Sequence, residues 1–517
     1  MLYTVAGLLM TRDRQTQSRV AIIDGDRRIS YAELAELAAQ YAAFLRSLRT
    51  APGDRVALLL PRSIETAAAF FGTQLAGAVA VFISDQLRAH QVAQIIADAE
   101  AAAVLTTARL RPLLKASSIT ADRVHDAGRP AVIASGRGLG RPIGKDLALL
   151  AYTSGSTGPP KGVMLTHDAL MAGAAIVADY LGLTAADRTM AFLPWSFDYG
   201  LNQVLSTLYA GGTVVIQRSA FPPDLCRTLI DAQVTGLAGV PSLWALLRER
   251  HSPFLKVSLP NLRYITNSGG SLPVDLIEEI RRSHPSTDLY LMYGLTEAFR
   301  STYLPPTQVD TRPTSIGKAI PNTEILVVGD DGRPCQAGQT GELVHRGPTA
   351  ARGYWRDNEA TAKVFRAHPF ASPDAAHPEI VVYSGDYVRA DEDGFLYYVG
   401  RRDDMFKSRG VRVNPSEIEA ELLRSGLIAE AVVLGIEHTG IDPAIIATVV
   451  PKDRQRFQLP DLLDYCRSEL PPHMMPAEVI PVSWLPRTPT GKADRALVRA
   501  RLKPDGVPAV HIPRESA

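Results

Sequence analysis

The chain is expected to fold as an α/β protein with a large N-terminal domain of helix-covered, largely parallel sheets, a small β subdomain and a small α+β C-terminal domain. Two observations predict this architecture. Short apolar runs alternate with helix-length segments through the first half of the 517 residues, which is typical of parallel strands joined by helices. Beyond residue 402 the pattern changes to a short succession of helices and strands.

The expected elements follow a regular order. In the first half they are Val56–Leu60 (strand), Ser63–Gln74 (helix), Val79–Ile83 (strand), a helix near His90–Ala99, and strands at Val104–Thr106, Leu147–Tyr152 and Thr213–Ile216. The glycine-rich segment Gly329–Gly353 alternates apolar and polar residues and indicates a β subdomain at about 320–402. The small domain at 403–502 is expected to contain Asn414–Leu423 (helix), Ala429–Leu434 (strand), Ala444–Val450 (strand) and Pro460–Leu470 (helix). Residues 1–402 are then the N-terminal core, and the tail 503–517 is expected to be disordered.

Composition describes an ordinary globular protein and narrows its partners. Hydrophobic residues make up 46% of the chain and charged residues 21%, with a net charge of +1, so no electrostatic case exists for nucleic acid or a membrane as partner. The three cysteines lack metal-ligand spacing, which favours a reduced, cytoplasmic protein. The uncharged stretch Thr66–Ile83 is interrupted by Gly72 and Gly77, and fits a buried helix and strand better than a membrane span. The N-terminus lacks the pattern of a signal peptide.

The most informative segment lies between two apolar runs, Leu147–Tyr152 and Val163–Leu165. It combines glycines, hydroxyls and a lysine in the order Thr153, Ser154, Gly155, Ser156, Thr157, Gly158, Pro159, Pro160, Lys161 and Gly162. Glycines let backbone N–H groups approach phosphate oxygens, hydroxyls add donors, and the lysine adds positive charge. The segment therefore predicts a loop that binds a polyphosphate.

Two other interpretations of this segment compete with a phosphate loop of this kind. A flexible Gly/Ser-rich linker is one alternative, but a linker needs neither the flanking strands nor the lysine. The P-loop of nucleotide triphosphatases is the other, and the spacing excludes it, because Gly162 rather than Ser or Thr follows Lys161.

Together with four later motifs, the loop resembles that of the adenylate-forming superfamily, which includes acyl-CoA synthetases, peptide-synthetase adenylation domains and luciferases. The later motifs are Tyr293-Gly294-Leu295-Thr296-Glu297, Tyr383-Ser384-Gly385-Asp386, Gly400-Arg401-Arg402-Asp403 with Lys407 and Gly410, and Pro489-Thr490-Gly491-Lys492. Ser384 stands where the family usually has threonine. The resemblance runs from about Tyr31 to Leu502. It implies an AMP-forming ligase, in which a carboxylate attacks the α-phosphate of ATP and a thiol then attacks the acyl-adenylate.

The resemblance implies a role for each matched residue of the nucleotide site. The triphosphate would be held by Thr153, Ser154, Gly155, Ser156, Thr157, Gly158 and Lys161, the adenine by Tyr293, Gly294, Gly269, Gly270 and Ser271, and the ribose by Asp386 and Arg401. Glu297 would bind Mg²⁺, a hard cation that prefers carboxylate oxygens, and Thr296 is carried over as a catalytic position. From the residues alone, Glu297 also reads as a helix-start glutamate and Asp386 as a turn residue.

The C-terminal domain is expected to be mobile and to supply two further residues. By resemblance, Lys492 would bridge the substrate carboxylate and the α-phosphate, since a Pro-x-Gly-Lys turn projects a lysine into a cleft; an exposed lysine alone would read as a solubility residue. Asp403 is matched to the hinge about which the domain swings between the two half-reactions. After the swing the loop Lys407–Gly410 would face the active site, where its glycine leaves room for a pantetheine arm.

The acid that is activated is indicated less directly. Where many acyl-CoA synthetases have a histidine, this chain has Phe197, and amino-acid-activating members have Phe-Asp with an aspartate that binds the substrate ammonium. Asp198 matches that aspartate. A buried carboxylate needs a partner, which an amine would supply; an aspartate that caps a helix starting near Tyr199 is the alternative. The other matched pocket residues are Tyr199, Asn202, Ala238, Asn267, Met292 and Arg300, with Lys492 at the carboxylate. Arg300 pairs either with Asp198 or with a substrate acid.

These residues predict a stand-alone enzyme that uses ATP and Mg²⁺ to load a small amino or imino acid, proline-like, onto a freestanding carrier protein. No carrier domain fits after Leu502, so the phosphopantetheine thiol is expected to come from a separate carrier protein or from CoA. An acyl-CoA ligase for a small or aryl carboxylic acid is the second hypothesis. A non-catalytic module that senses AMP or ATP is disfavoured, because it has no need of Lys492 on a mobile domain.

Overall fold

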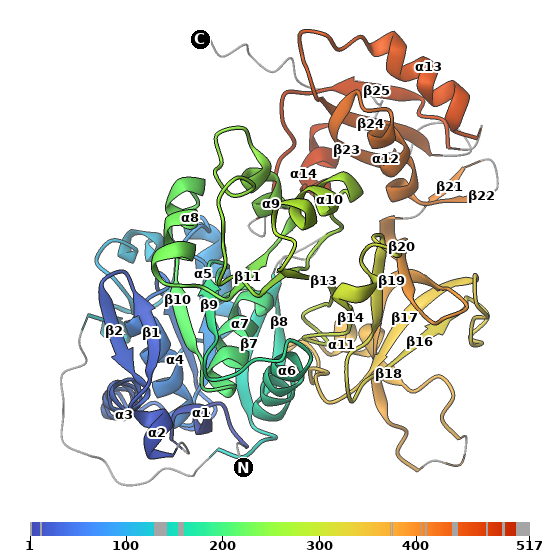
Figure 1. The fold of residues 1–517 in the computed structure, drawn as a ribbon. Helices are drawn as coiled ribbons and strands as arrows, with labels where there is room; N and C mark the ends of the chain where they lie inside the picture. The colour runs from blue at the N-terminus through green and yellow to red at the C-terminus, as the bar shows by residue number, and fades with distance from the viewer. Residues whose placement is uncertain are drawn as a thin grey trace. The chain divides into compact units, whose positions relative to one another are not determined.

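The computed structural model describes residues 3–10, 13–128, 142–153, 160–372, 374, 376–404, 406–408, 411–436, 443–471, 474–488 and 492–502. The chain divides into two compact units, residues 1–326 with 344–384, and residues 327–343 with 385–517 (Figure 1). We call them unit 1 and unit 2. The boundary expected at 402/403 stays a prediction.

The larger sheet of unit 1 runs in the order β15-β14-β13-β12-β11-β9-β10-β1-β2. Its neighbours from β13 to β1 are parallel, and antiparallel strands flank this parallel block on both sides. The strands are β1 (Val20–Asp24), β2 (Arg27–Ser30), β9 (Arg188–Ala191), β10 (Thr213–Ile216), β11 (Gly236–Gly239), β12 (Tyr264–Asn267), β13 (Asp288–Tyr293), β14 (Thr302–Leu304) and β15 (Ser315–Ala319).

A second sheet of unit 1 runs in the order β6-β5-β3-β4-β7-β8. All its neighbours are parallel except β7 and β8, which form an antiparallel hairpin. The strands are β3 (Arg55–Leu59), β4 (Val79–Phe82), β5 (Ala103–Thr106), β6 (Val124–Asp126), β7 (Leu147–Thr153) and β8 (Lys161–Thr166). The apolar runs of the sequence therefore became strands, and the largely parallel arrangement is confirmed.

Helices lie between and around these sheets. They are α1 (Gly7–Met10), α2 (Arg14–Gln17), α3 (Tyr31–Ser47), α4 (Ile64–Leu75), α5 (Ala89–Asp98), α6 (His167–Tyr180), α7 (Asp198–Tyr209), α8 (Pro222–Asp231), α9 (Pro241–Arg248), α10 (Val274–Ser283) and α11 (Asn358–Val364), with short 3₁₀ turns at Arg111–Leu114, Ala121–Arg123 and Pro306–Gln308. Helix α4 contacts both β3 and β1, while α6 contacts β7 and β8 and its partner α7 contacts β9 and β10. The pairs α3/α4 and α6/α7 thus pack between the two sheets, which explains why apolar residues surround them.

The apolar stretch that could suggest a membrane span is part of this core. Residues 66–74 of α4 are all buried, and the stretch continues through a turn at Gly77 (φ +76°) into β4. The Ser63 side chain caps the helix by accepting the N–H of Thr66 at 3.1 Å. In the described parts of the chain, no helix is long and apolar enough to cross a membrane.

Unit 2 contains a small α+β arrangement. Strands β23 (Ile428–Ile436), β24 (Ala444–Pro451) and β25 (Glu478–Pro481) form one sheet, and β21 (Phe406–Ser408) pairs with β22 (Val411–Val413). The helices are α12 (Pro415–Arg424), α13 (Leu459–Glu469) and α14 (Arg495–Arg501), with a 3₁₀ turn at Arg402–Asp404. Ile418, Leu422, Val433 and Leu462 are buried in one cluster between the sheet and its helices. The Asn414 side chain caps α12 by accepting the Ser416 N–H at 3.0 Å.

Five further strands lie along residues 324–401. They are β16 (Glu324–Val328), β17 (Thr340–Arg346), β18 (Phe365–Ala367), β19 (Ile380–Ala390) and β20 (Leu396–Arg401). The first residues of β19 pair with β18 in unit 1, and its last residues pair with β20 in unit 2, both antiparallel. The β-rich character expected for this region is therefore present.

Candidate active site

The predicted polyphosphate loop joins the two strands of the β7–β8 hairpin. Thr153 ends β7, Lys161 begins β8, and the two residues are partners in the strand register. The residues predicted as phosphate contacts between them, Ser154, Gly155, Ser156, Thr157 and Gly158, lie outside the described residues. The structure therefore brings together the two ends of the loop.

Lys161 contacts a segment that no sequence motif marks. Its Nζ lies 3.3 Å from Asp357 Oδ2 and 5.3 Å from the ring centroid of Tyr354. The two charged side chains are 41% and 38% exposed, so this ion pair contributes little stability and the lysine is able to exchange it for a phosphate. The Ala360 N–H lowers the pKa of the Asp357 carboxyl, and Lys161 lowers it further. No spacing in the sequence connects these residues with Lys161.

Tyr354 also contacts the predicted magnesium ligand. Its hydroxyl donates a 2.6 Å hydrogen bond to Glu297 Oε1. The backbone around it is held against β8, because Trp355 N–H donates to Gly162 O at 2.7 Å. Lys161 and Glu297, which lie far apart in the sequence, therefore share one neighbour. Glu297 would suit Mg²⁺, because this ion is usually bound in proteins by one or two carboxylates together with substrate phosphates.

The predicted adenine-binding residues follow two neighbouring parallel strands, β12 and β13. Tyr293 is the last residue of β13, and its carbonyl accepts the Ser301 N–H at 3.3 Å. After β12 the backbone turns at Gly269, whose φ of +83° is unfavourable for any residue with a Cβ. Asn267 Nδ2 donates to Gly270 O at 2.8 Å and holds this turn. The carboxyl ends of parallel strands lie at one edge of a sheet, which places these two segments side by side.

Asp198 is the first residue of α7 and is buried, with 5% of its surface exposed. Phe197, and not Asp198, is the N-cap. Asp198 Oδ2 lies 3.5 Å from Arg300 Nη1, and Oδ1 accepts the Thr296 hydroxyl at 3.4 Å. Burial raises the pKa of this carboxyl; Arg300, the Tyr199 N–H and the Thr296 hydroxyl only partly offset the loss of water.

Arg300 lies beside Asp198 and is only 2% exposed. Its Nη1 donates to the carbonyl of Phe299 at 3.0 Å, and its guanidinium carbon lies 4.7 Å from the centroid of the Tyr199 ring. The Tyr199 hydroxyl is within 2.6 Å of Thr266 Oγ1 and 2.9 Å of Thr266 O on β12. Residues from α7, β12 and the loop after β13 thus meet in one polar cluster inside unit 1.

The remaining predicted pocket residues are also buried in unit 1. Ala238 on β11 is the register partner of Thr266 on β12, and Met292 Sδ accepts the Tyr180 hydroxyl at 3.0 Å. Both amide atoms of Asn202 and the Oδ1 atom of Asn267 are buried with no hydrogen-bond partner among the described residues. A site with such groups suits a polar ligand better than an alkyl chain.

The predicted ribose-binding residues lie in unit 2. Asp386 on β19 and Arg401 on β20 are cross-strand partners, and Arg401 Nε lies 3.0 Å from Asp386 Oδ1. Asp386 is 5% exposed, whereas the Arg401 side chain is 50% exposed. Glu342 Oε1 accepts the Gly385 N–H at 3.1 Å and supports the same turn. No sequence motif marks Glu342.

Lys492 of unit 2 is hydrogen-bonded to Thr488 through its backbone. Its carbonyl accepts the Thr488 N–H at 2.8 Å, and its own N–H donates to Thr488 Oγ1 at 3.2 Å. The lysine is exposed. Pro489, Thr490 and Gly491, on which the motif depends, lie outside the described residues, as do Gly410 and the side chains of Asp403 and Lys407. The backbone of Asp403 belongs to the 3₁₀ turn at Arg402–Asp404.

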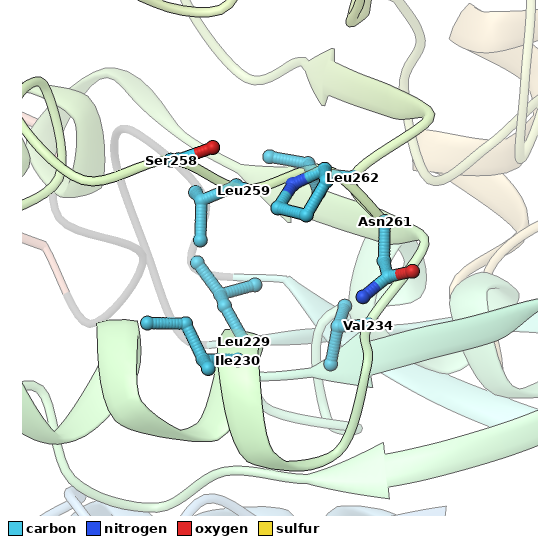
Figure 2. A pocket seen from close by; sticks show the side chains of 8 residues that line it. Leu229, Ile230, Val234, Ser258, Leu259, Asn261 and Leu262 are labelled. Atoms are coloured by element: carbon cyan, nitrogen blue, oxygen red, sulfur yellow. The ribbon is translucent and has the colours of Figure 1, made fainter.

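One surface pocket of unit 1 contains none of these residues (Figure 2). It is lined by Leu229, Ile230, Val234, Ser258, Leu259, Pro260, Asn261 and Leu262. No charged side chain lines it. The pocket therefore contains none of the chemical groups that the sequence predicts for the site.

Comparison with known proteins identifies relatives of two kinds. A linear gramicidin synthase protein of Brevibacillus parabrevis is 34% identical over 493 residues, which are 94% of this chain and 6% of that protein. Feruloyl-CoA synthase of Amycolatopsis sp is 31% identical over 509 residues, which are 95% of this chain and 97% of that protein. The chain thus spans only a small fraction of the peptide-synthase relative and nearly the full length of the other.

Solved structures of CoA ligases are similar to this chain over nearly its full length. The anthranilate CoA ligase AuaEII in complex with anthranoyl-AMP has a TM-score of 0.84 at 25% identity and covers 97% of both chains. The o-succinylbenzoate coenzyme A synthetase of Bacillus subtilis, in complex with ATP and magnesium ion, has a TM-score of 0.82 at 27% identity and covers 95% of this chain and 99% of that one.

Fold and motifs define an adenylate-forming enzyme. The model of the AMP-binding enzyme family matches residues 9–355 and that of its C-terminal domain matches residues 417–492, so the chain belongs to the AMP-binding enzyme family. An AMP-forming acid–thiol ligase is supported by the family, by the nearly full-length similarity to feruloyl-CoA synthase, and by similar structures that contain ATP, one of them with magnesium ion. The predicted superfamily, fold class and cofactors are confirmed. The roles of individual residues remain predictions.

Proposed function

We propose that this enzyme activates a small amino or imino acid and transfers it to the phosphopantetheine thiol of a freestanding carrier protein. The observation that supports the acid is the environment of Asp198. Its carboxylate is buried, yet its two side-chain contacts, at 3.4 and 3.5 Å, are long for charge-assisted hydrogen bonds. The similarity to the linear gramicidin synthase protein supports the class of acceptor.

A substrate ammonium would complete this environment. An ionised carboxylate accepts up to about four hydrogen bonds, so Asp198 has capacity beyond its present contacts. The raised pKa of the carboxyl reflects the cost of holding its charge without water. An ammonium placed beside it would offset that cost and orient the acid group of the substrate away from α7. Asp198 would then select for the amine and position the carboxylate.

The nucleotide would be bound by the residues that the sequence motifs predict. Lys161 and the hydroxyls that follow Thr153 would bind the triphosphate, and Glu297 would hold the metal ion that neutralises it. Asp386 and Arg401 would bind the ribose. Lys492 would donate to the substrate carboxylate and an α-phosphate oxygen, where negative charge accumulates as the two anions meet.

Replacement of Asp198 tests the substrate class. In ATP–pyrophosphate exchange, Asp198→Ala should lower activity with an amino acid by at least about tenfold, since a lost charged hydrogen bond costs roughly 1.5–3 kcal/mol. Activity with the matching acid that lacks the amine should change far less. Asp224→Ala is the control, because Asp224 is a first-turn aspartate of another helix, α8. A wild type that activates plain acids and no amino acid would overturn the proposal.

A second candidate function is an acyl-CoA ligase for a small or aryl acid. It is favoured by the near full-length similarity to feruloyl-CoA synthase and to the anthranilate CoA ligase. The two candidates differ in acceptor and acid. Incubation with radiolabelled acid, ATP and either CoA or a phosphopantetheinylated carrier protein separates them: acyl-CoA as the sole thioester product would replace the carrier-protein proposal with this one.

A further inference from the structure

One edge of the buried Arg300 guanidinium has no partner among the described residues. Nη1 contacts the Phe299 carbonyl and Asp198, but Nε and Nη2 are buried and make no hydrogen bond there. The side chain is 3% exposed. An arginine whose buried donors lack both water and acceptors destabilises the folded protein. Such groups in a native site call for an acceptor from a ligand.

The edge that lacks partners has the geometry of an anion-binding fork. The Nε–H and Nη2–H bonds of a guanidinium point in parallel, and this spacing matches the two oxygens of a carboxylate. The Tyr199 ring lies 4.7 Å from the guanidinium carbon and packs against the group. Nη1 is held from the other side by Phe299 and Asp198. Arg300 is therefore oriented before a ligand arrives.

Asn202 adds a second set of unused polar atoms on the same helix face. It follows Asp198 by four residues on α7, and residues at this spacing share a face. Neither its amide nitrogen nor its carbonyl oxygen has a partner in the described part of the chain. Gly173 on α6 lets the Phe299 ring pack closely here, because a Cβ there would lie 2.4 Å from Phe299 Cδ1 and 3.4 Å from Asn202 Nδ2.

We infer that the substrate carries a second carboxylate, which binds the Nε–Nη2 edge of Arg300, in addition to the carboxylate that is adenylated. This rests on the proposed function, in which Asp198 binds the substrate ammonium. Once Asp198 serves the amine, the buried positive charge of Arg300 needs another anion. The substrate is then a small acidic amino acid, in which each of the three charged groups has a partner. Asn202 contributes hydrogen bonds beside the second carboxylate.

Four acids of equal length test the two parts of this assignment independently. L-Glutamate has the amine and a second carboxylate, L-norvaline has only the amine, glutarate has only the second carboxylate, and pentanoate has neither. Pyrophosphate exchange is measured with each, and with the corresponding four-carbon and six-carbon sets. We expect the second carboxylate to raise kcat/KM by at least about tenfold, because a buried hydrogen-bonding group would otherwise be left unpaired. The amine contrast tests the proposed function separately.

Arg300 variants show whether this residue is the origin of the preference. Arg300→Met should reduce the ratio of L-glutamate to L-norvaline to about one through a loss with L-glutamate alone. Arg300→Lys, which keeps the charge but not the fork, should restore the ratio only in part. The control is Arg263→Met, since Arg263 lies 4.9 Å from the Tyr264 ring and 3.0 Å from Asp187 outside this cluster; it should leave the ratio unchanged.

Arg300→Met leaves Asp198 without its buried partner, so the folding of this variant is checked by thermal melting. The double variant Asp198→Asn/Arg300→Met removes the unpaired negative charge. In the double variant the quantity measured is the ratio of kcat/KM for glutarate to kcat/KM for pentanoate, because neither acid has an amine that needs Asp198. A ratio of about one there supports the inference. Exchange that is equal for probes with and without the second carboxylate, or absent with every probe that has one, would overturn it. So would a preference that survives in both variants.

Discussion

The Tyr354 hydroxyl donates a 2.6 Å hydrogen bond to Glu297, and the Lys161 ammonium lies 5.3 Å from the centroid of the same tyrosine ring. One side chain thus contacts both the predicted metal ligand and the predicted phosphate lysine. Tyr354 is brought there by the backbone that follows Arg352, whose N–H donates to Met164 O on β8 at 2.9 Å. This arrangement makes Tyr354 a positioning residue for Glu297.

Tyr354→Phe should therefore weaken metal-dependent activity. Loss of a hydrogen bond to a charged group costs roughly 1.5–3 kcal/mol, so we expect the Mg²⁺ concentration for half-maximal pyrophosphate exchange to rise by about tenfold or more. The KM for the acid should change little, because the acid-binding cluster does not include this hydroxyl. Tyr397→Phe is a matched control, since the Tyr397 hydroxyl also donates to a carboxylate, Asp391, at 3.1 Å. An unchanged Mg²⁺ dependence would show that the hydroxyl does not position Glu297.

Lys492→Ala should abolish formation of the adenylate and leave thioester formation from a supplied acyl-adenylate intact. The reason is that the lysine is proposed to act only where the carboxylate meets the α-phosphate. The two half-reactions are measured separately, with Lys452→Ala as control because Lys452 is another exposed lysine of unit 2. Equal loss of both half-reactions would exclude this role.

Asp403→Pro should have the opposite effect. Proline fixes φ near −65° and removes an N–H, which stiffens the 3₁₀ turn at Arg402–Asp404 proposed as the hinge. We expect normal pyrophosphate exchange and impaired transfer to the thiol. Asp403→Ala, which keeps backbone freedom, separates an effect of the dihedral angle from loss of the side chain. Transfer by Asp403→Pro at the wild-type rate would place the hinge elsewhere.

Stability should decrease as the pH is lowered, because two buried histidines resist protonation. Burial lowers the pKa of His345 to about 4 and that of His167 to about 4, from 6.5. Between pH 4 and pH 6.5 the histidines bind more protons in the unfolded chain than in the folded one. The free energy of unfolding therefore rises with pH across this range, and the stabilisation is lost as the pH falls toward 4. Each histidine accounts for up to about 3 kcal/mol.

Thermal midpoints measured from pH 4.5 to 7.5 check this prediction. His345 is fully buried, and its Nε2 lies 3.2 Å from Thr349 Oγ1. His345→Gln should lower the midpoint at pH 7 but make it depend less steeply on pH between 4.5 and 6.5. His368→Gln is the control, since the His368 side chain is only partly buried. A slope unchanged in His345→Gln would contradict the assignment.

The sequence by itself determined the elements and the class of reaction. The runs predicted as strands around Val79–Ile83 and Thr213–Ile216 are β4 and β10, and the helix predicted at Ser63–Gln74 is α4 with Ser63 as its cap. Local patterns are sufficient here, because apolar periodicity and capping act within a few residues. The motifs around Lys161 and Glu297 identified the family in the same way, since each motif is a short contiguous segment.

Only the tertiary structure decided which distant residues meet. Asp357 and Tyr354 reach Lys161 because the backbone before them is hydrogen-bonded to β8, and Arg300 reaches Asp198 because the loop after β13 packs against the start of α7. No pattern in the sequence encodes these pairs, which arise from parallel strand order and from helix packing between sheets. The sequence allowed Arg300 to pair with Asp198 or with a substrate acid. The structure placed it beside Asp198 and left its second edge buried, since burial and hydrogen-bond satisfaction are properties of the folded chain alone.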